Sequence, residues 1–333
     1  MEPATHTLTG YMMSRAGLRD WCPLATPVLL MAANVPDIDF VSLLGDDLLV
    51  LDWHRGPTHA LCFICLMAAL PLAPMWLLAR RRMRWGRAYA VSLLGVLSHL
   101  ALDWTNIFGV RLLEPFNRRY FHLDITAVVD LWLLGVLLLA AAWFVISRLV
   151  SSEIGDRRPS GRGVALAALA FILFWQAGRY AFHQRALLVL DSRIYDGETP
   201  QRVAALPHFA SPLHWTGLVE TKTAYKVFEI DLTGGPFDPA GGRTFHKPEF
   251  NGAMQAARRT STFERYFRFL EYPIWLALPA GEPEGATRVQ VMDMRFGWPG
   301  EERFVATATV DSEGRVVEES FRFDPPGHGP RLR

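Results

Sequence analysis

Four long apolar stretches near the N-terminus constrain this chain more than any other feature. They run from Thr58 to Ala79, Ala88 to Trp104, Thr126 to Val150 and Val164 to Tyr180. Each is close to the roughly 20 residues that an α-helix needs to cross about 30 Å of hydrocarbon. We therefore predict four membrane spans. No basic segment followed by an apolar run and a small-residue cleavage site precedes them, so we expect the spans themselves to direct insertion.

Two shorter helical pieces precede the first span, from His6 to Leu18 and from Pro27 to Asn34. Neither can cross a bilayer alone, and a re-entrant or interfacial hairpin packed against the later helices fits their lengths. The alternative is one tilted span from about Pro23 to Leu44. Pro36 favours the hairpin, because the residue before a proline disfavours helix.

Arginines gather in two of the links between the predicted spans. One link is Arg80–Arg87, and the other is surrounded by Arg148, Arg157, Arg158 and Arg162. By the positive-inside rule both links are cytoplasmic, which places everything after Tyr180 on the outer face. We therefore expect a multipass protein of the bacterial inner membrane with a periplasmic C-terminal domain. Membrane lipid is the expected partner. The net charge of +1 gives no reason to expect nucleic acid.

After His183 the pattern changes. Partial period-two alternation of β-branched and aromatic residues predicts strands within Leu213–Leu232, Arg288–Phe296, Arg303–Val310 and Val316–Phe323. Apolar spacings of three and four predict a helix from Phe250 to Leu270. The predicted fold is a mainly α-helical multipass membrane domain, residues 1–182, followed by a smaller soluble α+β domain, residues 183–333.

Cys22, Cys62 and Cys65 provide no disulfide framework. Cys62 and Cys65 are spaced like half of a zinc ribbon, but they lie in an apolar helix and no second pair follows. We expect them to be small buried side chains.

Ionisable residues stand at the ends of the apolar stretches, where contact with hydrocarbon is costly and a functional site is the usual reason for them. His99 and Asp103 are four residues apart, so they share one face of a helix. Asp37 and Asp39 alternate, and a turn at residues 55–57 separates His54 from His59. The set of candidate metal ligands is His6, Asp37, Asp39, His54, His59, His99, Asp103 and Asp130.

Imidazole and carboxylate together suit zinc, manganese or iron. Eight potential ligands exceed the need of one tetrahedral ion, so we expect a divalent metal, with zinc the leading candidate, in a centre of two or three ions. Asp37 and Asp103 are assigned as catalytic residues. Arg55 either binds an anionic substrate or anchors the chain to lipid phosphate.

Five ordered motifs carry a resemblance to a known family. They are Thr5-His6-x-Leu8-Thr9-Gly10, Asn34-Val-Pro-Asp37-Ile-Asp39, His54-Arg55-Gly56-x-Thr58-His59, Ser98-His99-x-x-x-Asp103 and Gly109-Val-x-Leu-Leu-x-Pro-Phe116. Over about residues 1 to 180 the chain resembles the bacterial membrane-bound, metal-dependent hydrolases described as LexA-regulated inner-membrane hydrolases. The order and type of the ligands are also distantly similar to those of zinc-dependent phospholipase C.

The resemblance implies metal ligation by His6, Asp37, His54, His59, His99 and Asp103, with Asp39 and Asp130 as further candidates. It also implies a phosphodiester substrate, which includes phospholipid.

We therefore expect a membrane-bound hydrolase in which metal-activated water attacks an ester or phosphodiester at the periplasmic face. A non-catalytic membrane scaffold with a structural metal is the alternative. A transporter that uses the His and Asp residues as an ion relay fits less well, because the polar residues gather at one face and no internal repeat is evident.

Overall fold

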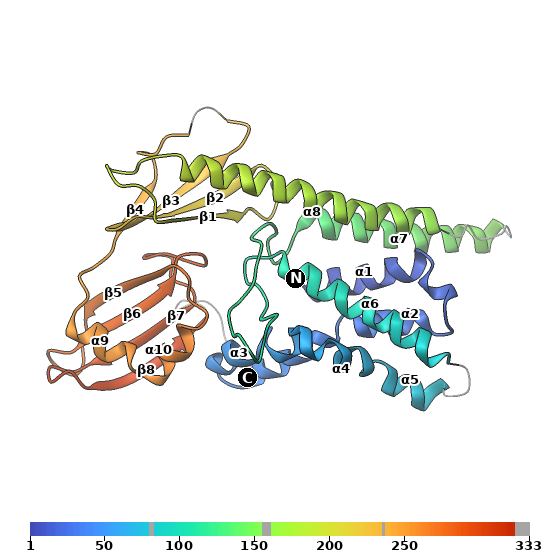
Figure 1. The fold of residues 1–333 in the computed structure, drawn as a ribbon, viewed down its shortest axis with the longest axis horizontal. Helices are drawn as coiled ribbons and strands as arrows, with labels where there is room; N and C mark the ends of the chain where they lie inside the picture. Colours follow the sequence, from blue (N-terminus) through green and yellow to red (C-terminus); the bar gives the residue numbers. More distant parts are fainter. Residues whose placement is uncertain (80–82, 155–160, 235–236, 324–333) are drawn as a thin grey trace. The chain divides into compact units, whose positions relative to one another are not determined.

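A computed structural model describes residues 1–79, 83–154, 161–234 and 237–323 (Figure 1). The chain divides into two compact units. Unit 1 comprises Met1–Asp39, Arg55–Arg185 and Pro207–Trp215, and unit 2 comprises Phe40–His54, Ala186–Leu206 and Thr216–Arg333. The predicted domain boundary between residues 182 and 183 stays a prediction.

Helices form nearly all of the regular structure in the N-terminal half. In chain order they are α1 (Pro3–Arg15), η1 (Leu18–Asp20), α2 (Ala25–Ala32), η2 (Val35–Leu44), α3 (Asp47–Trp53), η3 (Pro57–His59), η4 (Leu61–Phe63), α4 (Ile64–Ala69), α5 (Leu72–Ala79), α6 (Trp85–Trp104), α7 (Leu131–Ile154) and α8 (Arg162–Asp191).

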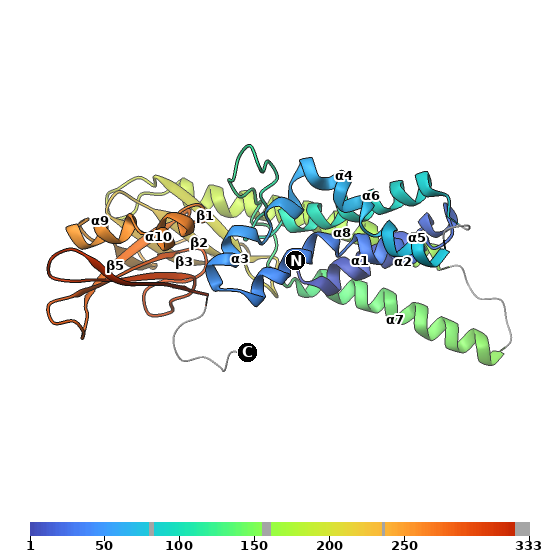
Figure 2. The same cartoon turned by 90° about the horizontal axis from the view of Figure 1, so that it is seen from below.

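Small residues let three of these helices approach closely. Helices α1, α2 and α6 pack against one another, and α4 packs on α6 (Figure 2). A Cβ on Gly95 of α6 would lie 2.7 Å from the Cβ of Ala32 in α2, and one on Gly10 of α1 would lie 3.0 Å from the Cβ of Ala33. Backbones this close leave no room for larger side chains, so the end of α2 is held directly against α6.

Two of the four predicted spans are single helices that are long and apolar enough to cross a membrane, α7 and α8. The first predicted span, Thr58–Ala79, is instead broken into short helices. Only the bent pair Asp47–His59 and Leu61–Leu77, with a bend of 56°, passes the same test, which gives two or three candidate spans in the described part of the chain. The prediction of a mainly α-helical multipass fold is therefore overstated, because the helical N-terminal half has two or three candidate spans and is followed by two antiparallel sheets.

Helix α6 matches the second predicted span in position but is not among the candidate spans within the described residues. Its sequence contains Ser92, Ser98, His99 and Asp103, which lower its hydropathy. Ser92, His99 and Asp103 are fully buried, so the face of α6 that carries them lies inside unit 1.

The predicted hairpin before the first span is present as α1 and α2, which pack together. The alternative of one helix from Pro23 to Leu44 is wrong, because α2 ends at Ala32. Asn34 follows that end, and its Nδ2 donates to the carbonyl oxygen of Leu30 at 2.8 Å. The 3-10 helix η2 then begins at Val35, one residue before Pro36.

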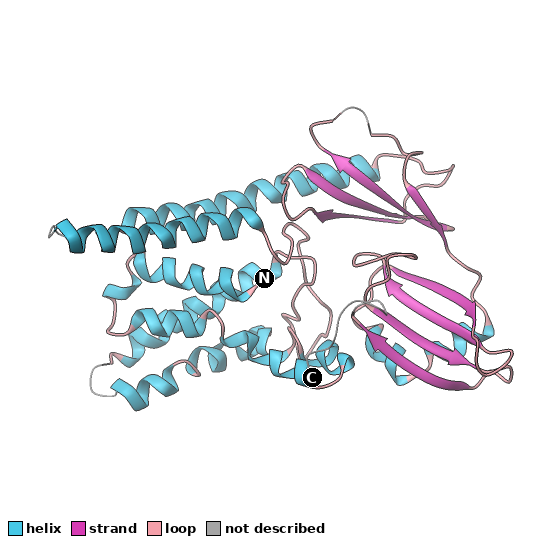
Figure 3. Ribbon diagram, turned by 180° about the vertical axis from the view of Figure 1, so that it is seen from behind, coloured by secondary structure: helices cyan, strands magenta, loops and turns pink. Residues whose placement is uncertain are grey.

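Two four-stranded antiparallel sheets account for most of the described regular structure of unit 2 (Figure 3). Their strands, in spatial order, are β1 (Arg202–Pro207), β2 (His214–Glu220), β3 (Ala224–Asp231) and β4 (Arg243–His246), and then β5 (Pro273–Pro279), β6 (Thr287–Asp293), β7 (Val305–Val310) and β8 (Val316–Arg322). The predicted strand region Leu213–Leu232 is two strands, and β1, β4 and β5 were not predicted.

Two short helices, α9 (Gly252–Arg258) and α10 (Ser261–Tyr266), pack on the second sheet. They replace the single helix predicted from Phe250 to Leu270. Thr260 has extended backbone, with φ −78° and ψ 156°, and this residue separates the two helices. The apolar face still reaches the core, since Phe263 and Tyr266 are fully buried.

Helix α3 belongs to unit 2, although the residues on either side of it belong to unit 1. The side chain of Asp46 caps its first turn by accepting from the Leu49 amide at 2.6 Å. The helix packs on α10 and β8. Arg265 of α10 donates its Nε–H to Asp52 of α3 at 2.8 Å. The chain thus leaves unit 1 after Asp39, contributes one helix to unit 2 and returns at Arg55.

Cys62 and Cys65 are exposed, so the prediction that they are buried is wrong. Of the arginines used to orient the chain, Arg80–Arg82, Arg157 and Arg158 lie outside the described residues.

Candidate metal centre

Four side chains of unit 1 converge on one point. Asp37 comes from η2, His59 from the end of η3, and His99 and Asp103 from successive turns of α6. One ligand atom from each lies within 4.8 Å of the other three. His59, His99 and Asp103 are completely buried, and only 8% of the Asp37 side chain is exposed. We call these four residues the metal group.

The spacing of the four ligand atoms is that of a small coordination shell. The Nε2 atoms of His59 and His99 are 3.1 Å apart. Asp37 Oδ1 lies 3.7 Å from the first nitrogen and 3.5 Å from the second. Asp103 Oδ2 lies 3.5 Å from the first and 3.7 Å from the second. Two nitrogens bound to one tetrahedral zinc ion at about 2.0–2.1 Å lie roughly 3.3 Å apart, so the group could hold a single ion.

The orientation of His99 is fixed from behind by the end of α2. Its Nδ1 lies 2.8 Å from the carbonyl oxygen of Ala33. A carbonyl oxygen only accepts, so Nδ1 carries the hydrogen, and in the neutral ring Nε2 presents its lone pair to the metal group. The close approach of Gly95 to Ala32 brings that carbonyl within reach.

His59 is oriented in the same way by its neighbours in the turn. The hydroxyl of Thr58 donates to Asp39 Oδ2 at 2.8 Å. Because this hydrogen is already used, Thr58 Oγ1 accepts from Nδ1 of His59, 3.0 Å away. Asp39 Oδ2 also lies 3.4 Å from that nitrogen. The Nε2 of neutral His59 therefore presents a lone pair as well.

Two imidazole lone pairs thus face each other at 3.1 Å, flanked by two carboxylate oxygens. Four electron-rich atoms in a buried site repel one another unless a cation lies between them. Metal-bound histidines commonly donate their second ring N–H to a carbonyl or carboxylate. Here His99 donates to the carbonyl of Ala33, and His59 donates to the hydroxyl of Thr58, which in turn is bonded to Asp39. The donor set of two nitrogens and two oxygens fits a divalent transition metal ion.

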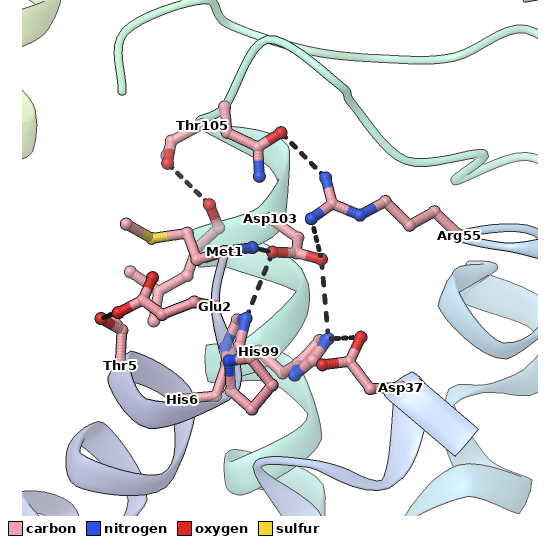
Figure 4. A network of polar contacts seen from close by, with 12 residues as sticks. Met1, Glu2, Thr5, His6, Asp37, Arg55, His99, Asp103 and Thr105 are labelled. Carbon is pink, nitrogen blue, oxygen red and sulfur yellow. Dashed lines mark hydrogen bonds and ion pairs between the residues drawn. The ribbon is translucent and has the colours of Figure 1, made fainter. Parts of the chain in front are cut away.

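The two carboxylates of the group differ in their surroundings. Asp103 Oδ1 accepts from the Met1 amine and from His6 Nε2, which is 3.2 Å away, and Asp103 Oδ2 lies 3.3 Å from Arg55 Nη2 (Figure 4). Asp37 Oδ2 is buried and has no hydrogen-bond partner among the described residues. Asp103 Oδ2 also forms no hydrogen bond there, but the Arg55 guanidinium lies beside it. Asp37 Oδ2 is therefore the more available of these two oxygens.

His6 stacks on His99 with ring centroids 3.8 Å apart. Burial lowers the pKa of His6 well below its usual value, so this ring is neutral at neutral pH.

Arg55, the predicted substrate-binding residue, borders the metal group and is 4% exposed. Its backbone is in the left-handed region, with φ 55°, and its amide donates to Asp39 Oδ2 at 2.7 Å. Its Nη1 donates to Asn106 Oδ1 at 2.8 Å. These contacts hold the guanidinium beside Asp103.

The remaining predicted ligands lie outside the metal group. His6 lies behind Asp103, and Asp39 lies behind His59. His54 belongs to unit 2, where its ring contacts that of Phe40 with centroids 4.8 Å apart. Asp130 caps α7 by accepting from the amides of residues 132 and 133, and it also accepts from Trp175 Nε1 at 3.1 Å. These four residues are not part of the metal group, and metal ligation by them stays a prediction.

Sequence reasoning missed three contributors to the site, the carbonyl of Ala33, the hydroxyl of Thr58 as a support for His59, and the side chain of Asn106. A backbone carbonyl carries no signal in the sequence. Asn106, three residues after Asp103, is the one that spacing alone could have suggested.

Comparison with known proteins places the chain in a family. The sequence profile of the YdjM inner membrane protein family matches residues 1–186. The chain belongs to this family, and every residue of the metal group lies in the matched region. Neither the curated proteins nor the solved structures that were compared include a match. The match supports the bacterial inner-membrane part of the resemblance drawn from the motifs, and supports neither hydrolase activity nor the likeness to phospholipase C.

Proposed function

We propose that this member of the YdjM inner membrane protein family is a metal-dependent hydrolase that cleaves an ester or phosphodiester at the membrane surface. One observation carries the proposal, namely that His59 and His99 direct two lone pairs at each other across 3.1 Å between the carboxylates of Asp37 and Asp103. A cation held between these four atoms would remove their mutual repulsion. Zinc is the leading candidate for the ion, since a donor set of imidazole and carboxylate at this spacing suits it.

The residues around the ion have separable roles in this proposal. A bound divalent ion would lower the pKa of water and polarise the oxygen of an ester or phosphoryl group. Oδ2 of Asp37 has no partner among the described residues, so it can hold a proton taken from the attacking water. Asp103 is fixed by His6 and Arg55 and keeps the ligand set in place. The guanidinium of Arg55 supplies positive charge for an anionic substrate.

We further propose a multipass arrangement in the inner membrane with the C-terminal domain in the periplasm. The two or three candidate spans and the family match support a membrane location. The clustering of arginines in the links supports the orientation. Phospholipid is then a reachable substrate, because the esters and phosphodiester of its headgroup region lie at the membrane surface.

The test combines metal analysis with activity. The full chain, purified in detergent, is expected to contain a stoichiometric divalent transition metal and to hydrolyse at least one member of a panel of p-nitrophenyl esters, bis-p-nitrophenyl phosphate and phospholipid vesicles. His99→Ala should lose both metal and activity. His246→Ala, which alters an exposed residue of β4, should keep both. Absence of metal from the wild-type protein together with unchanged behaviour of His99→Ala would refute the proposal.

A second function is favoured by one specific feature. Structural metal sites are closed by four protein ligands, whereas catalytic sites usually keep one position for water or substrate. The metal group already has four ligand atoms. A non-catalytic membrane scaffold with a structural metal is therefore the alternative. It predicts bound metal, a large loss of thermal stability on chelation and no hydrolysis by the metal-loaded protein.

A further inference from the structure

We propose that Arg55 forms an oxyanion-binding site beside the metal group, that Asn106 is the positioning residue for this arginine, and that the ligand is the phosphoryl group of a phosphoester. The inference deepens the proposed function and rests on it. Three features carry it, which are the way Arg55 is clamped, the edge that its guanidinium leaves open, and the buried donor that remains unpaired.

Arg55 is clamped at both its backbone and one end of its guanidinium. Its amide donates to Asp39 Oδ2 at 2.7 Å, and its carbonyl accepts from the Arg111 amide at 3.0 Å. Nη1 donates to Asn106 Oδ1 at 2.8 Å and lies 3.4 Å from the carbonyl oxygen of Gly109. A side chain held in this way loses little further entropy when it binds a ligand.

The clamp leaves the opposite edge of the guanidinium open. Nη1 is the nitrogen on the Cδ side, so Nη2 and Nε form the other edge, which can bind two oxygens of one anion at once. Nη2 has a single long contact, 3.3 Å to Asp103 Oδ2. Nε is buried and has no partner among the described residues. The open edge is therefore adjacent to a carboxylate of the metal group.

Asn106 sets this orientation. Its side chain is completely buried, and its Oδ1 accepts from Arg55 Nη1 and from the amides of Phe108 at 2.9 Å and Gly109 at 3.3 Å. Gly109 has φ +75°, and a Cβ there would lie 2.9 Å from the carbonyl oxygen of Phe121. The loop that holds Asn106 is thus tight, and the direction of its carboxamide is fixed.

The unpaired donor of Arg55 indicates the kind of ligand. Its Nε is buried without a hydrogen-bond partner in the part of the chain that the structure describes. Leaving such a donor unmet is unfavourable, and an oxygen acceptor relieves it. A carboxylate would use both its oxygens on the arginine edge. A phosphoryl group has further oxygens that can face the metal group at the same time, so it fits both halves of the site.

The experiment measures the binding of inorganic phosphate to zinc-loaded full-length protein by calorimetry. Wild-type protein should bind phosphate more tightly than acetate. Arg55→Lys and Asn106→Ala should each weaken phosphate binding about tenfold or more, the loss expected for a charge-assisted or orienting hydrogen bond. Their zinc content should be unchanged. Arg179→Lys, a buried arginine elsewhere in unit 1, and Asn117→Ala, an exposed loop residue, are the matched controls and should bind phosphate like the wild type.

A double-mutant cycle separates positioning from a merely structural role. If Asn106 acts through Arg55, the doubly substituted protein should bind phosphate no more weakly than Arg55→Lys alone. Phosphate affinity that is equal in wild type and both single variants would overturn the inference, as would zinc loss that parallels the loss of phosphate. Should Arg55→Lys not fold, Asn106→Ala decides the question.

The outcomes for the inference and for the proposed function can be told apart. Phosphate binding that depends on Arg55 and Asn106, in a zinc-loaded protein that hydrolyses no ester of the panel, supports the oxyanion site and refutes the hydrolase. Hydrolysis of a phosphoester that both variants retain at the wild-type rate supports the hydrolase and overturns the oxyanion site.

Discussion

The Nε2 atoms of His59 and His99 lie 3.1 Å apart, although 40 residues separate them in the chain. Each ring is oriented by a group behind it, the hydroxyl of Thr58 for His59 and the carbonyl of Ala33 for His99. The approach of the two nitrogens is therefore imposed by the surrounding structure. Changes behind the rings should weaken metal binding even though every ligand is still present.

Thr58→Val tests this for His59. The variant keeps the shape of the side chain but removes the acceptor for Nδ1 and the donor to Asp39. Loss of a hydrogen bond that supports a metal ligand typically weakens metal binding about 10- to 100-fold. A competition titration against a chelating dye measures the change. The control is Thr7→Val in α1, which removes a hydroxyl that bonds to the carbonyl of Pro3 and to the side chain of Asn34. Equal metal affinities of the two variants would contradict the prediction.

Gly95→Ala tests the same idea for His99. The added Cβ would lie 2.7 Å from the Cβ of Ala32, so α6 and α2 must separate and the bond from His99 to Ala33 must lengthen. Such overpacking typically costs about 1–3 kcal/mol. We expect a lower thermal unfolding midpoint and weaker metal binding. Gly135→Ala of α7 is the matched control, because its Cβ would meet nothing within 4 Å. If both variants bind metal like the wild type, the close approach does not support the site.

Glu220 in β2 predicts how unit 2 responds to acid. Burial raises its pKa, but hydrogen bonds from Lys247 and Arg202 outweigh this and hold the pKa below its usual value. The folded pKa is thus below the unfolded one, so this stabilisation is present above about pH 4.3 and is lost as the pH falls through the folded pKa.

Glu220→Gln should therefore lower the thermal unfolding midpoint at neutral pH, and its difference from wild type should shrink as the pH falls from about 7 to about 3. Glu229→Gln, an exposed residue of β3, serves as the control and should leave the midpoint unchanged. If the difference in unfolding midpoint between Glu220→Gln and wild type stays constant over this range, the contacts to Lys247 and Arg202 do not determine how stability falls at low pH.

The ion pair between Arg265 and Asp52 should help to hold α3 in unit 2. Both side chains are partly exposed, so Arg265→Asp should cost no more than about 1 kcal/mol beyond the like-charge repulsion that it introduces. Faster amide hydrogen exchange in residues 47–53 is the expected readout. The reciprocal pair Arg265→Asp with Asp52→Arg should recover slow exchange. Arg243→Asp, which breaks an exposed pair with Glu301, should leave exchange in α3 unchanged.

The eight predicted ligands include all four residues of the metal group and four residues that lie outside it. His99 and Asp103 could be paired because one helix carries both at a spacing of four residues. Asp37 and His59 could be included because their motifs stand at the ends of apolar stretches. His54 was included on the same grounds, and it lies in unit 2 because a sharp turn at Arg55 separates it from His59. Asp130 looks like a ligand in the sequence, and in the structure its Oδ1 caps α7 while its Oδ2 accepts from Trp175.

The fold was predictable where the local sequence of an element is enough to determine its structure. Helices α7 and α8 each contain a window long and apolar enough to cross a membrane, and they match the predicted spans. Helix α6 was predicted as a membrane span but is not among the candidate spans of the described residues. Its buried polar residues face helices that are distant in sequence, and local hydropathy does not reveal such contacts. The strand β5 escaped notice since its partner in the sheet, β6, supplies the hydrogen bonds that define it.

Helix α3 has a practical consequence for anyone who wishes to dissect this protein. The region matched by the family ends at residue 186, yet the partners of α3, which are α10 and β8, come later in the chain. A fragment that stops at residue 186 would expose the buried side chains of Val50 and Leu51, and a fragment that starts there would lack the helix that covers α10 and β8. No single cut of the chain yields two pieces that each keep their own partners, so the two halves are best produced and studied as one molecule.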